Sequence, residues 1–125
     1  MLVDDSPFCN LIMQKTLARL PADLHINDFT NPLEALAQVP TLNPALIFLD
    51  LNMPELDGWG FLQRMRDTAL TNQVIILTSS TSFVDRARAA EFTNVLSYQV
   101  KPPTKAFMDE LLHLLQTKFQ ADPAD

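Results

Sequence analysis

Short uninterrupted apolar runs recur along the chain, and each is bounded by residues that favour turns. The two strongest runs are 45–49 (ALIFL) and 74–77 (VIIL), and weaker ones occupy 1–3, 24–26 and 96–100. A strand that is buried on both faces of a parallel sheet reads as a continuous apolar segment of this kind. The pattern therefore predicts five strands, with 45–49 in a central position.

Between these runs the apolar residues recur at the spacing of amphipathic helices. The first helix is expected to begin at Pro7, after an N-cap at Ser6, and to be closed by Pro21. Its predicted buried face carries Cys9, Ile12, Met13, Thr16, Leu17 and Leu20.

Start and stop signals delimit the other four helices. The second is expected to end before Pro40, because proline disrupts a helix interior, and the third to run over 58–66 with Trp59 partly exposed. Side chains that cap helices precede the second, fourth and fifth, namely Asn31, Ser82 and Thr104. Strands that alternate with helices predict an α/β fold. The expected architecture is a five-stranded parallel sheet with five helices on both faces.

Polar side chains with metal- and phosphate-binding chemistry come directly after the predicted strands. Asp4 and Asp5 follow the first strand, Asp50 the third, Thr78 the fourth and Lys101 the fifth. The carboxyl ends of parallel strands share one edge of the sheet, which is where ligands bind in open α/β folds. Three carboxylates at that edge would repel one another. A hard divalent cation such as Mg²⁺, which prefers oxygen ligands, would relieve the repulsion.

Four separated features together resemble the receiver domain of two-component response regulators, of the chemotaxis-regulator type. They are the Asp4-Asp5 pair after an apolar start, Asp50 within LDLNMP, Thr78 at the end of VIIL, and Lys101-Pro102 after a short strand. Their order and spacing match the family over nearly the whole chain. The resemblance implies a flavodoxin-like receiver fold, with the five-stranded parallel sheet in the order 2-1-3-4-5. It also implies a cis peptide bond between Lys101 and Pro102.

The resemblance also implies a phosphoryl acceptor and a cofactor. Asp50 would accept the phosphoryl group, and the cofactor would be Mg²⁺. Asp5 and Asp50 would be direct metal ligands, Asp4 would act through water, and the backbone carbonyl of Asn52 would contribute as well.

A switch of shape, rather than catalytic turnover, is the implied output, so no enzymatic activity is expected. Thr78 and Lys101 would contact the phosphoryl group. As Thr78 is drawn toward that group, Tyr98 would turn inward. The surface formed by the fourth helix, fifth strand and fifth helix would then change.

The implied phosphodonor is a sensor histidine kinase or a histidine phosphotransfer protein. The implied partner on the output side is a downstream protein that binds the fourth helix, fifth strand and fifth helix, with a phosphorylation-dependent dimer as a further expectation. A net charge of -6 argues against direct nucleic-acid binding. No apolar run reaches bilayer-spanning length, so no membrane contact is expected. A single cysteine fits a cytoplasmic location.

Three other functions compete with this interpretation. A degenerate receiver, acting as a phosphorylation-independent interaction scaffold, would be expected to have lost one of Asp5, Asp50, Thr78 or Lys101, and all four are present. A phosphohydrolase with an aspartyl nucleophile normally places an acid two residues later, where this chain has Asn52. A flavodoxin-like cofactor binder would need a glycine-rich phosphate loop, which the sequence lacks, and fold alone does not fix function.

Two questions about the extent of the chain stay open at this stage. The short first strand, 1–3, is either abbreviated or the remainder of a longer one whose start is missing. The expected organisation is a receiver domain over 1–120 and a polar tail at 121–125, and it is either a protein that acts alone or one domain of a longer regulator.

Overall fold

Five parallel strands form one sheet in the order β2-β1-β3-β4-β5 in the computed structural model, which describes residues 1–119. The strands are β1 (Leu2–Val3), β2 (Asp28–Phe29), β3 (Leu46–Leu49), β4 (Gln73–Thr78) and β5 (Val95–Val100). The helices are α1 (Pro7–Ala18), α2 (Pro32–Leu42), α3 (Gly58–Asp67), α4 (Phe83–Ala89) and α5 (Lys105–Leu114), which continues into the π-helical turn η1 (Leu115–Phe119). The predicted alternation and strand order are confirmed. The predicted tail at 121–125 lies outside the described residues.

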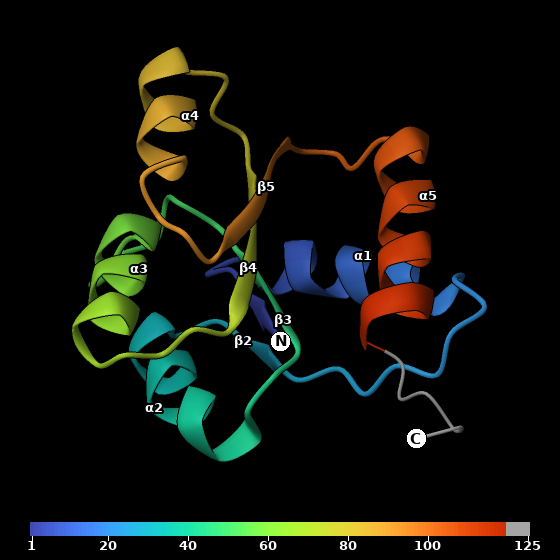
Figure 1. Cartoon of the computed structure of the whole chain (residues 1–125), viewed down its shortest axis with the longest axis horizontal. Coiled ribbons are helices and arrows are strands. Elements are labelled where there is room, and N and C mark those ends of the chain that lie inside the picture. The colour runs from blue at the N-terminus through green and yellow to red at the C-terminus, as the bar shows by residue number, and fades with distance from the viewer. Residues whose placement is uncertain (120–125) are drawn as a thin grey trace.

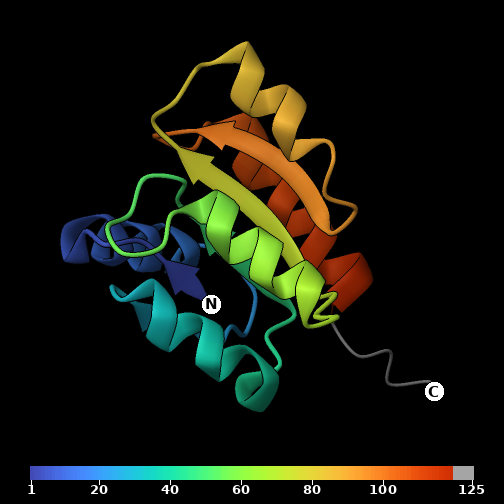
Figure 2. The same cartoon turned by 90° about the vertical axis from the view of Figure 1, so that its left-hand side faces the viewer.

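The helices cover both faces of the sheet, with α1 and α5 on one side and α2, α3 and α4 on the other (Figures 1 and 2). Alternate strand residues point to opposite faces. On β3, Ile47 and Leu49 join the apolar cluster under α2 and α3, whereas Leu46 and Phe48 join the cluster under α1 and α5. This burial on both faces explains why β3 reads as an unbroken apolar run.

Strand register brings the predicted site residues to the same edge of the sheet. Val3 pairs with Leu49, and Leu49 pairs with Ile76, so the residues that come after β1 and β3 leave the sheet side by side. Thr78 pairs with Val100, the last residue of β5. The loops after β1, β3, β4 and β5 therefore meet at this edge.

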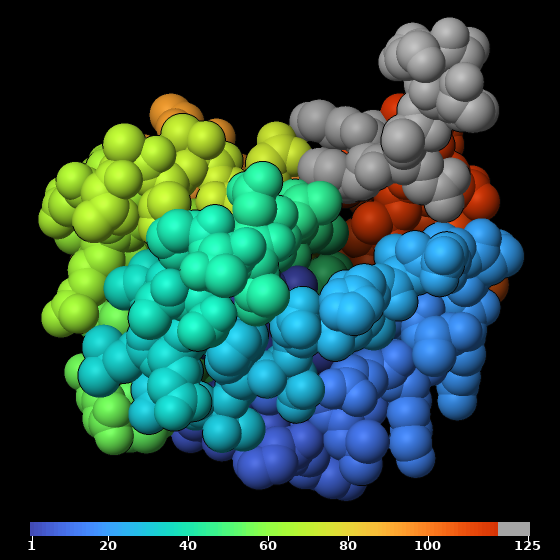
Figure 3. Space-filling model, turned by 90° about the horizontal axis from the view of Figure 1, so that it is seen from below, coloured from blue at the N-terminus to red at the C-terminus, as the bar shows by residue number. Residues whose placement is uncertain are grey.

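The second predicted strand, 24–26, is wrong, because β2 is formed by Asp28 and Phe29 instead. Leu24 and Ile26 are half-buried and pack against the cluster under α1 and α5, so their alternation reflects packing and not strand pairing. Seen from below (Figure 3), the segment before β2, in light blue, lies beside α2, in teal. Because β1 has only two residues, only Asp28 and Phe29, which are in register with it, can pair with that strand.

The prediction that the second helix ends before Pro40 is also wrong, since α2 continues to Leu42. Pro40 lies in the last turns of the helix, where its missing N–H removes a single backbone hydrogen bond. Asn43 then closes the helix in a left-handed conformation, at φ 44°, and its N–H donates to the carbonyl of Val39.

Two individual burial predictions are wrong, those for Ile12 and Trp59. Ile12, predicted to be buried, is 45% exposed, whereas the neighbouring polar residue Asn10 is buried. Trp59, predicted to be partly exposed, is buried, because it stacks against Phe92 with ring centroids 6.2 Å apart.

None of the helices within residues 1–119 combines the length and the apolar character that a membrane span requires.

Candidate functional site

Asp50 is the first residue after the central strand β3. Its backbone N–H donates to the carbonyl of Val3 at 3.0 Å, which ties the end of β3 to β1. The residue is only 7% exposed. The loop after it returns at Gly58, where an added Cβ would lie 2.6 Å from the carbonyl oxygen of Asp50. The backbone of Asp50 is therefore confined on two sides, by β1 and by Gly58.

The ionisation of Asp50 is set by its burial. Burial raises the pKa of the Asp50 carboxyl above its ordinary value, and the nearby charge of Asp4 adds to that effect. The ammonium of Lys101 and the backbone N–H groups of Asn52 and Leu51 act in the opposite direction, and the net pKa is raised. The carboxyl thus lies in surroundings that disfavour its negative charge.

Asp4, Asp5 and Asp50 converge as the sequence predicted. Each offers a carboxylate oxygen, and the three oxygens lie within 4.8 Å of one another. Asp4 and Asp50 are buried, whereas Asp5 is exposed at the rim of the site. Three carboxylates at this separation match the oxygen donors and negative charge that Mg²⁺ requires. The residues present therefore fit such a cation.

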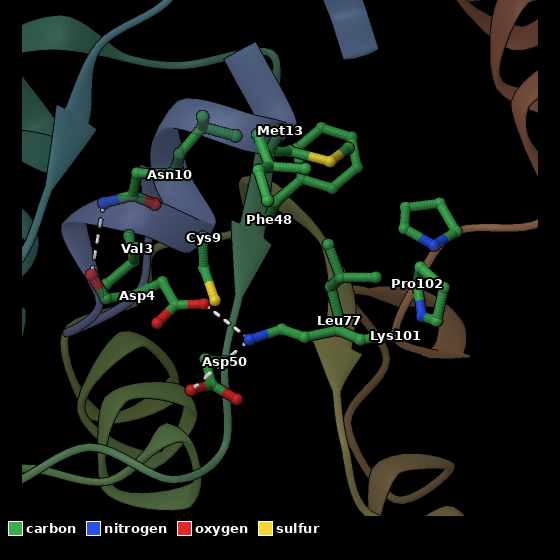
Figure 4. Close-up of a pocket in the computed structure, with 13 residues that line it drawn as sticks. Val3, Asp4, Cys9, Asn10, Met13, Phe48, Asp50, Leu77, Lys101 and Pro102 are labelled. Carbon is green, nitrogen blue, oxygen red and sulfur yellow. Dashed lines mark hydrogen bonds and ion pairs between the residues drawn. The ribbon is translucent and has the colours of Figure 1, made fainter. Parts of the chain in front are cut away.

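Lys101 reaches into the same cluster from the end of β5 (Figure 4). Its Nζ lies 2.6 Å from Oδ2 of Asp4 and 3.8 Å from Oδ2 of Asp50, and Oδ1 of Asp4 accepts a hydrogen bond from the N–H of Ser6. Burial lowers the pKa of Lys101, but the hydrogen bond to Asp4 and the charges of Asp50 and Asp4 outweigh it, so the net pKa is raised. The peptide bond from Lys101 to Pro102 is cis, as expected.

Thr78 is fully buried at the end of β4. Its carbonyl accepts a hydrogen bond from the backbone N–H of Lys101 at 2.8 Å, which fixes the two residues next to each other. Its hydroxyl oxygen accepts a hydrogen bond from the N–H of Ser80 at 3.2 Å. That bond uses an oxygen lone pair and leaves the hydroxyl proton available to donate.

Ser80 connects Thr78 to the rest of the loop before α4. Its hydroxyl donates to Oδ2 of Asp85 at 2.6 Å, and its carbonyl accepts a hydrogen bond from the hydroxyl of Tyr98 at 2.9 Å. The Tyr98 ring is half-buried against the core and lies under the guanidinium of Arg86, 4.7 Å from the ring centroid. The predicted switch residues are thus linked through Ser80.

The last predicted residue, Asn52, lies exposed in the loop after β3, and its backbone N–H donates to the Asp50 carboxylate. Sequence reasoning missed two other features of the site. One is Asn10, whose amide bonds to the backbone of Asp4. The other is a pocket of about 150 Å³ beside Lys101, with apolar walls that include Cys9, Met13, Phe48, Leu77 and Pro102 (Figure 4). A polar residue on an otherwise apolar helix face was the available signal for Asn10.

A doubly wound parallel sheet carries an acidic cluster, a threonine and a lysine at its carboxyl edge, which is the arrangement of a receiver-type regulatory domain. The family model for the response regulator receiver domain matches residues 1–113. The chain belongs to that family.

The curated relatives are longer proteins. The chain is 34% identical over 82 residues to a protein-glutamate methylesterase/protein-glutamine glutaminase of Methanospirillum hungatei, a match that covers 66% of this chain and 24% of the relative. A protein of the same description from Myxococcus xanthus is 29% identical over 106 residues, which covers 85% of this chain and 30% of the relative. The nitrate/nitrite response regulator NarL of Escherichia coli is 26% identical over 80 residues, which covers 64% of this chain and 37% of the relative. The chain therefore spans about a quarter to two fifths of these relatives.

Solved receiver structures share the fold over almost the whole chain. A two-component response regulator from Cytophaga hutchinsonii superposes with a TM-score of 0.83 at 24% identity and covers 94% of this chain and 95% of that one. The response regulator domain of CheB from Thermotoga maritima superposes with a TM-score of 0.75 at 25% identity. This match covers 98% of this chain and 96% of that one. The Mn²⁺-bound form of response regulator Rcp1 gives the same TM-score, identity and coverage.

Proposed function

We propose that this chain is a phospho-accepting receiver, in which Asp50 takes a phosphoryl group from a phosphohistidine of a sensor histidine kinase or a histidine phosphotransfer protein. The observation that supports it most strongly is the convergence of three carboxylates within 4.8 Å, with Lys101 beside two of them. In the transfer, an Asp50 carboxylate oxygen forms the new bond to phosphorus. The phosphorus–nitrogen bond to the donor imidazole breaks, and that nitrogen keeps the electron pair.

The proposed cofactor is Mg²⁺, held directly by Asp5 and Asp50, through water by Asp4, and by the backbone carbonyl of Asn52. The acidic cluster fits this cation in charge and donor type, and the similar response regulator Rcp1 was solved with Mn²⁺ bound. When bound, the cation would neutralise negative charge on the phosphoryl oxygens.

Lys101 and Thr78 are the proposed contacts to the phosphoryl group. Lys101 has its shorter contact with Asp4 and its longer one with Asp50, so its ammonium already lies beside the acceptor. The free proton of the buried Thr78 hydroxyl can donate to a phosphoryl oxygen while its lone pair still accepts from Ser80.

The proposed switch transmits the movement of Thr78 through Ser80. Tyr98 is half-buried, and its hydroxyl donates to the Ser80 carbonyl. A shift of Thr78 toward Asp50 would therefore pull on Ser80 and alter its bonds to Tyr98 and Asp85. Phosphorylation biases the two arrangements only if they differ by a few kcal/mol.

The proposed output surface is formed by α4, β5 and α5. Phe83 is 88% exposed and Val84 is 74% exposed at the start of α4, and Leu96 of β5 is also exposed. Adjacent exposed large apolar side chains such as Phe83 and Val84 are characteristic of protein-binding surfaces. A downstream protein is the proposed occupant, and a phosphorylation-dependent dimer is the second candidate. The chain itself is proposed to turn over no substrate, and a cytoplasmic location stays a prediction.

The test is intact-mass measurement of the whole chain after incubation with acetyl phosphate, with and without Mg²⁺. We expect one phosphoryl adduct in the presence of Mg²⁺, absent from Asp50→Asn and kept in Asp57→Asn, which changes an exposed aspartate at the start of α3. No adduct on the folded wild-type chain, with a phosphohistidine donor also failing, would support the scaffold function instead.

A further inference from the structure

Asn10 is a buried polar side chain on the inner face of α1. It is 2% exposed and shares this face with the apolar residues Met13 and Leu17. Asparagine in such a position is retained only when its polar atoms find partners, because an unpaired buried amide is costly. Its partners are therefore informative.

The Asn10 carboxamide joins the ends of two strands at the acidic edge. Its Nδ2 donates to the carbonyl of Asp4 and to the carbonyl of Phe29, both at 3.1 Å. The Phe29 carbonyl also accepts the backbone N–H of Asp4 at 3.2 Å. Because β1 and β2 pair over only two residues each, this amide adds a cross-link just where their ladder ends. Figure 4 shows the hydrogen bond from Asn10 to Asp4.

The cross-link acts on the backbone that carries the acidic pair. The carbonyl of Asp4 and the N–H of Asp5 belong to one peptide plane, so fixing that carbonyl fixes the direction in which the chain continues to Asp5. The Asp4 side chain is already fixed by Ser6 and Lys101. Asn10 therefore holds the main chain, while the other two contacts hold the carboxylate.

We propose that Asn10 is a positioning residue for the acidic loop, where its amide sets the Asp4–Asp5 backbone in the geometry that binds a divalent cation. This inference rests on the proposed function, because it concerns the affinity of the same metal site. Groups that orient metal ligands through hydrogen bonds typically change metal affinity by about 10- to 100-fold when they are removed. We expect the lower end of that range here, because Asn10 acts through the backbone of the ligands.

The experiment compares Mg²⁺ dissociation constants, measured by calorimetry on the full chain, with melting temperatures. Asn10→Leu has a similar volume without a donor, and we expect about tenfold weaker Mg²⁺ binding. Leu17→Ala, on the same face of α1, removes buried apolar volume away from the loop. It should lower the melting temperature while the Mg²⁺ dissociation constant stays that of the wild type. Asn10→Gln, which keeps a donor, should recover part of the affinity.

The possible outcomes separate this inference from the proposed function. If Asn10→Leu lowers the melting temperature but binds Mg²⁺ like the wild type, Asn10 is merely structural and the inference is overturned. If Asn10→Leu does not fold, Asn10→Ser supplies the same comparison, since its side chain is too short to bridge both carbonyls. A wild-type chain that binds no Mg²⁺ overturns both the metal site and this inference. A chain that binds Mg²⁺ but forms no phosphoryl adduct overturns the acceptor role of Asp50 and leaves this inference standing.

Discussion

At the scale of single residues, the site is organised by how one ammonium is shared between two buried carboxylates. Lys101 bonds to Asp4 at 2.6 Å and lies 3.8 Å from Asp50. Asp4 is therefore the better neutralised of the two, and Asp50 keeps a raised pKa because of its burial. A buried carboxylate whose negative charge is only weakly neutralised by its neighbours is suited to bind a ligand that brings positive charge.

The raised pKa of Asp50 predicts that Asp50→Asn stabilises the metal-free chain at neutral pH. The folded chain holds this proton to a higher pH than the unfolded chain does, so stability falls as pH rises through the window between the two pKa values. Above that window the buried charge opposes folding, and asparagine removes the charge at nearly constant shape. Thermal melts in a chelator should show a gain of a few degrees at about pH 7 that shrinks toward about pH 4.

The control for this prediction is Asp57→Asn, which changes an exposed carboxylate. An Asp50→Asn chain that melts below the wild type at neutral pH would mean that the Asp50 charge is well compensated in the folded state, contrary to this account.

Removing Lys101 should leave Asp4 buried without its cation. We expect Lys101→Met to lower the free energy of unfolding by about 1–3 kcal/mol, the usual penalty for an unpaired buried polar group. The matched control is Lys105→Met, which breaks the exposed pair with Asp109 and should change stability by less than about 1 kcal/mol. Since the pKa of Lys101 is raised, its contribution should persist at neutral pH and disappear only at strongly alkaline pH. Equal effects of the two variants in urea unfolding would argue against a special role for Lys101.

At the scale of secondary-structure elements, the turn from β3 into α3 has no room for a side chain at its first helical residue. A Cβ at Gly58 would lie 2.6 Å from the Asp50 carbonyl oxygen and 2.8 Å from Cα of Leu51, both backbone atoms. At Gly60 the corresponding close atom is a terminal methyl of Leu56, which can rotate away. The two glycines are a matched pair in one helix.

Gly58→Ala should therefore destabilise the chain by about 1–3 kcal/mol, because the backbone that carries Asp50 must shift. Gly60→Ala should change stability by no more than about 1 kcal/mol, since the gain in helix propensity offsets a small adjustment of Leu56. Chemical unfolding of both variants tests this difference, and a Gly58→Ala chain as stable as Gly60→Ala would show that the close approach is not restrictive.

The conformation of the loop between β4 and α4 depends on the hydrogen bonds of Ser80. Ser80→Ala removes the hydrogen bond to Asp85 and the oxygen that accepts from the N–H of Ser82. Because α4 has only seven residues, we expect its amide hydrogens to exchange several-fold faster while those of β3 and β4 do not change. The neighbouring variant Ser79→Ala, at an exposed position, should leave the exchange of α4 unaltered. Identical exchange in the two variants would rule out a bracing role for Ser80.

At the scale of the whole molecule, the features that could be predicted are those that burial on both faces of the sheet imposes on the sequence. Residues 45–49 and 74–77 read as strands because helices cover both of their sides, and Asp50 and Thr78 lie at their carboxyl ends. Segment 24–26 failed because half-buried packing mimics strand alternation. The prediction of a helix end at Pro40 failed because α2 keeps its helical backbone past the proline to Leu42, and Asn43 closes it in a left-handed conformation.

The residues of the site also fall into those that could be predicted from the sequence and those that could not. Asp4, Asp5, Asp50 and Lys101 could be placed together from strand order alone. Asn10 could not, because its partners are backbone carbonyls of Asp4 and Phe29 at the ends of β1 and β2, and a two-residue strand such as β2 leaves almost no periodic signal. Contacts to main-chain atoms depend on register, which the sequence specifies only weakly in such short strands.

The central claim is that Asp50 becomes an aspartyl phosphate. The most direct measurement is reduction of the phosphorylated chain with borohydride, which converts an acyl phosphate to an alcohol, followed by peptide mapping. We predict that the aspartate at position 50 alone becomes homoserine, in an Mg²⁺-dependent manner, after incubation with a phosphohistidine donor or acetyl phosphate. Reduction at Asp4, Asp5 or Asp57 instead, or no reduced residue in a chain that carries a phosphoryl adduct, would contradict the account.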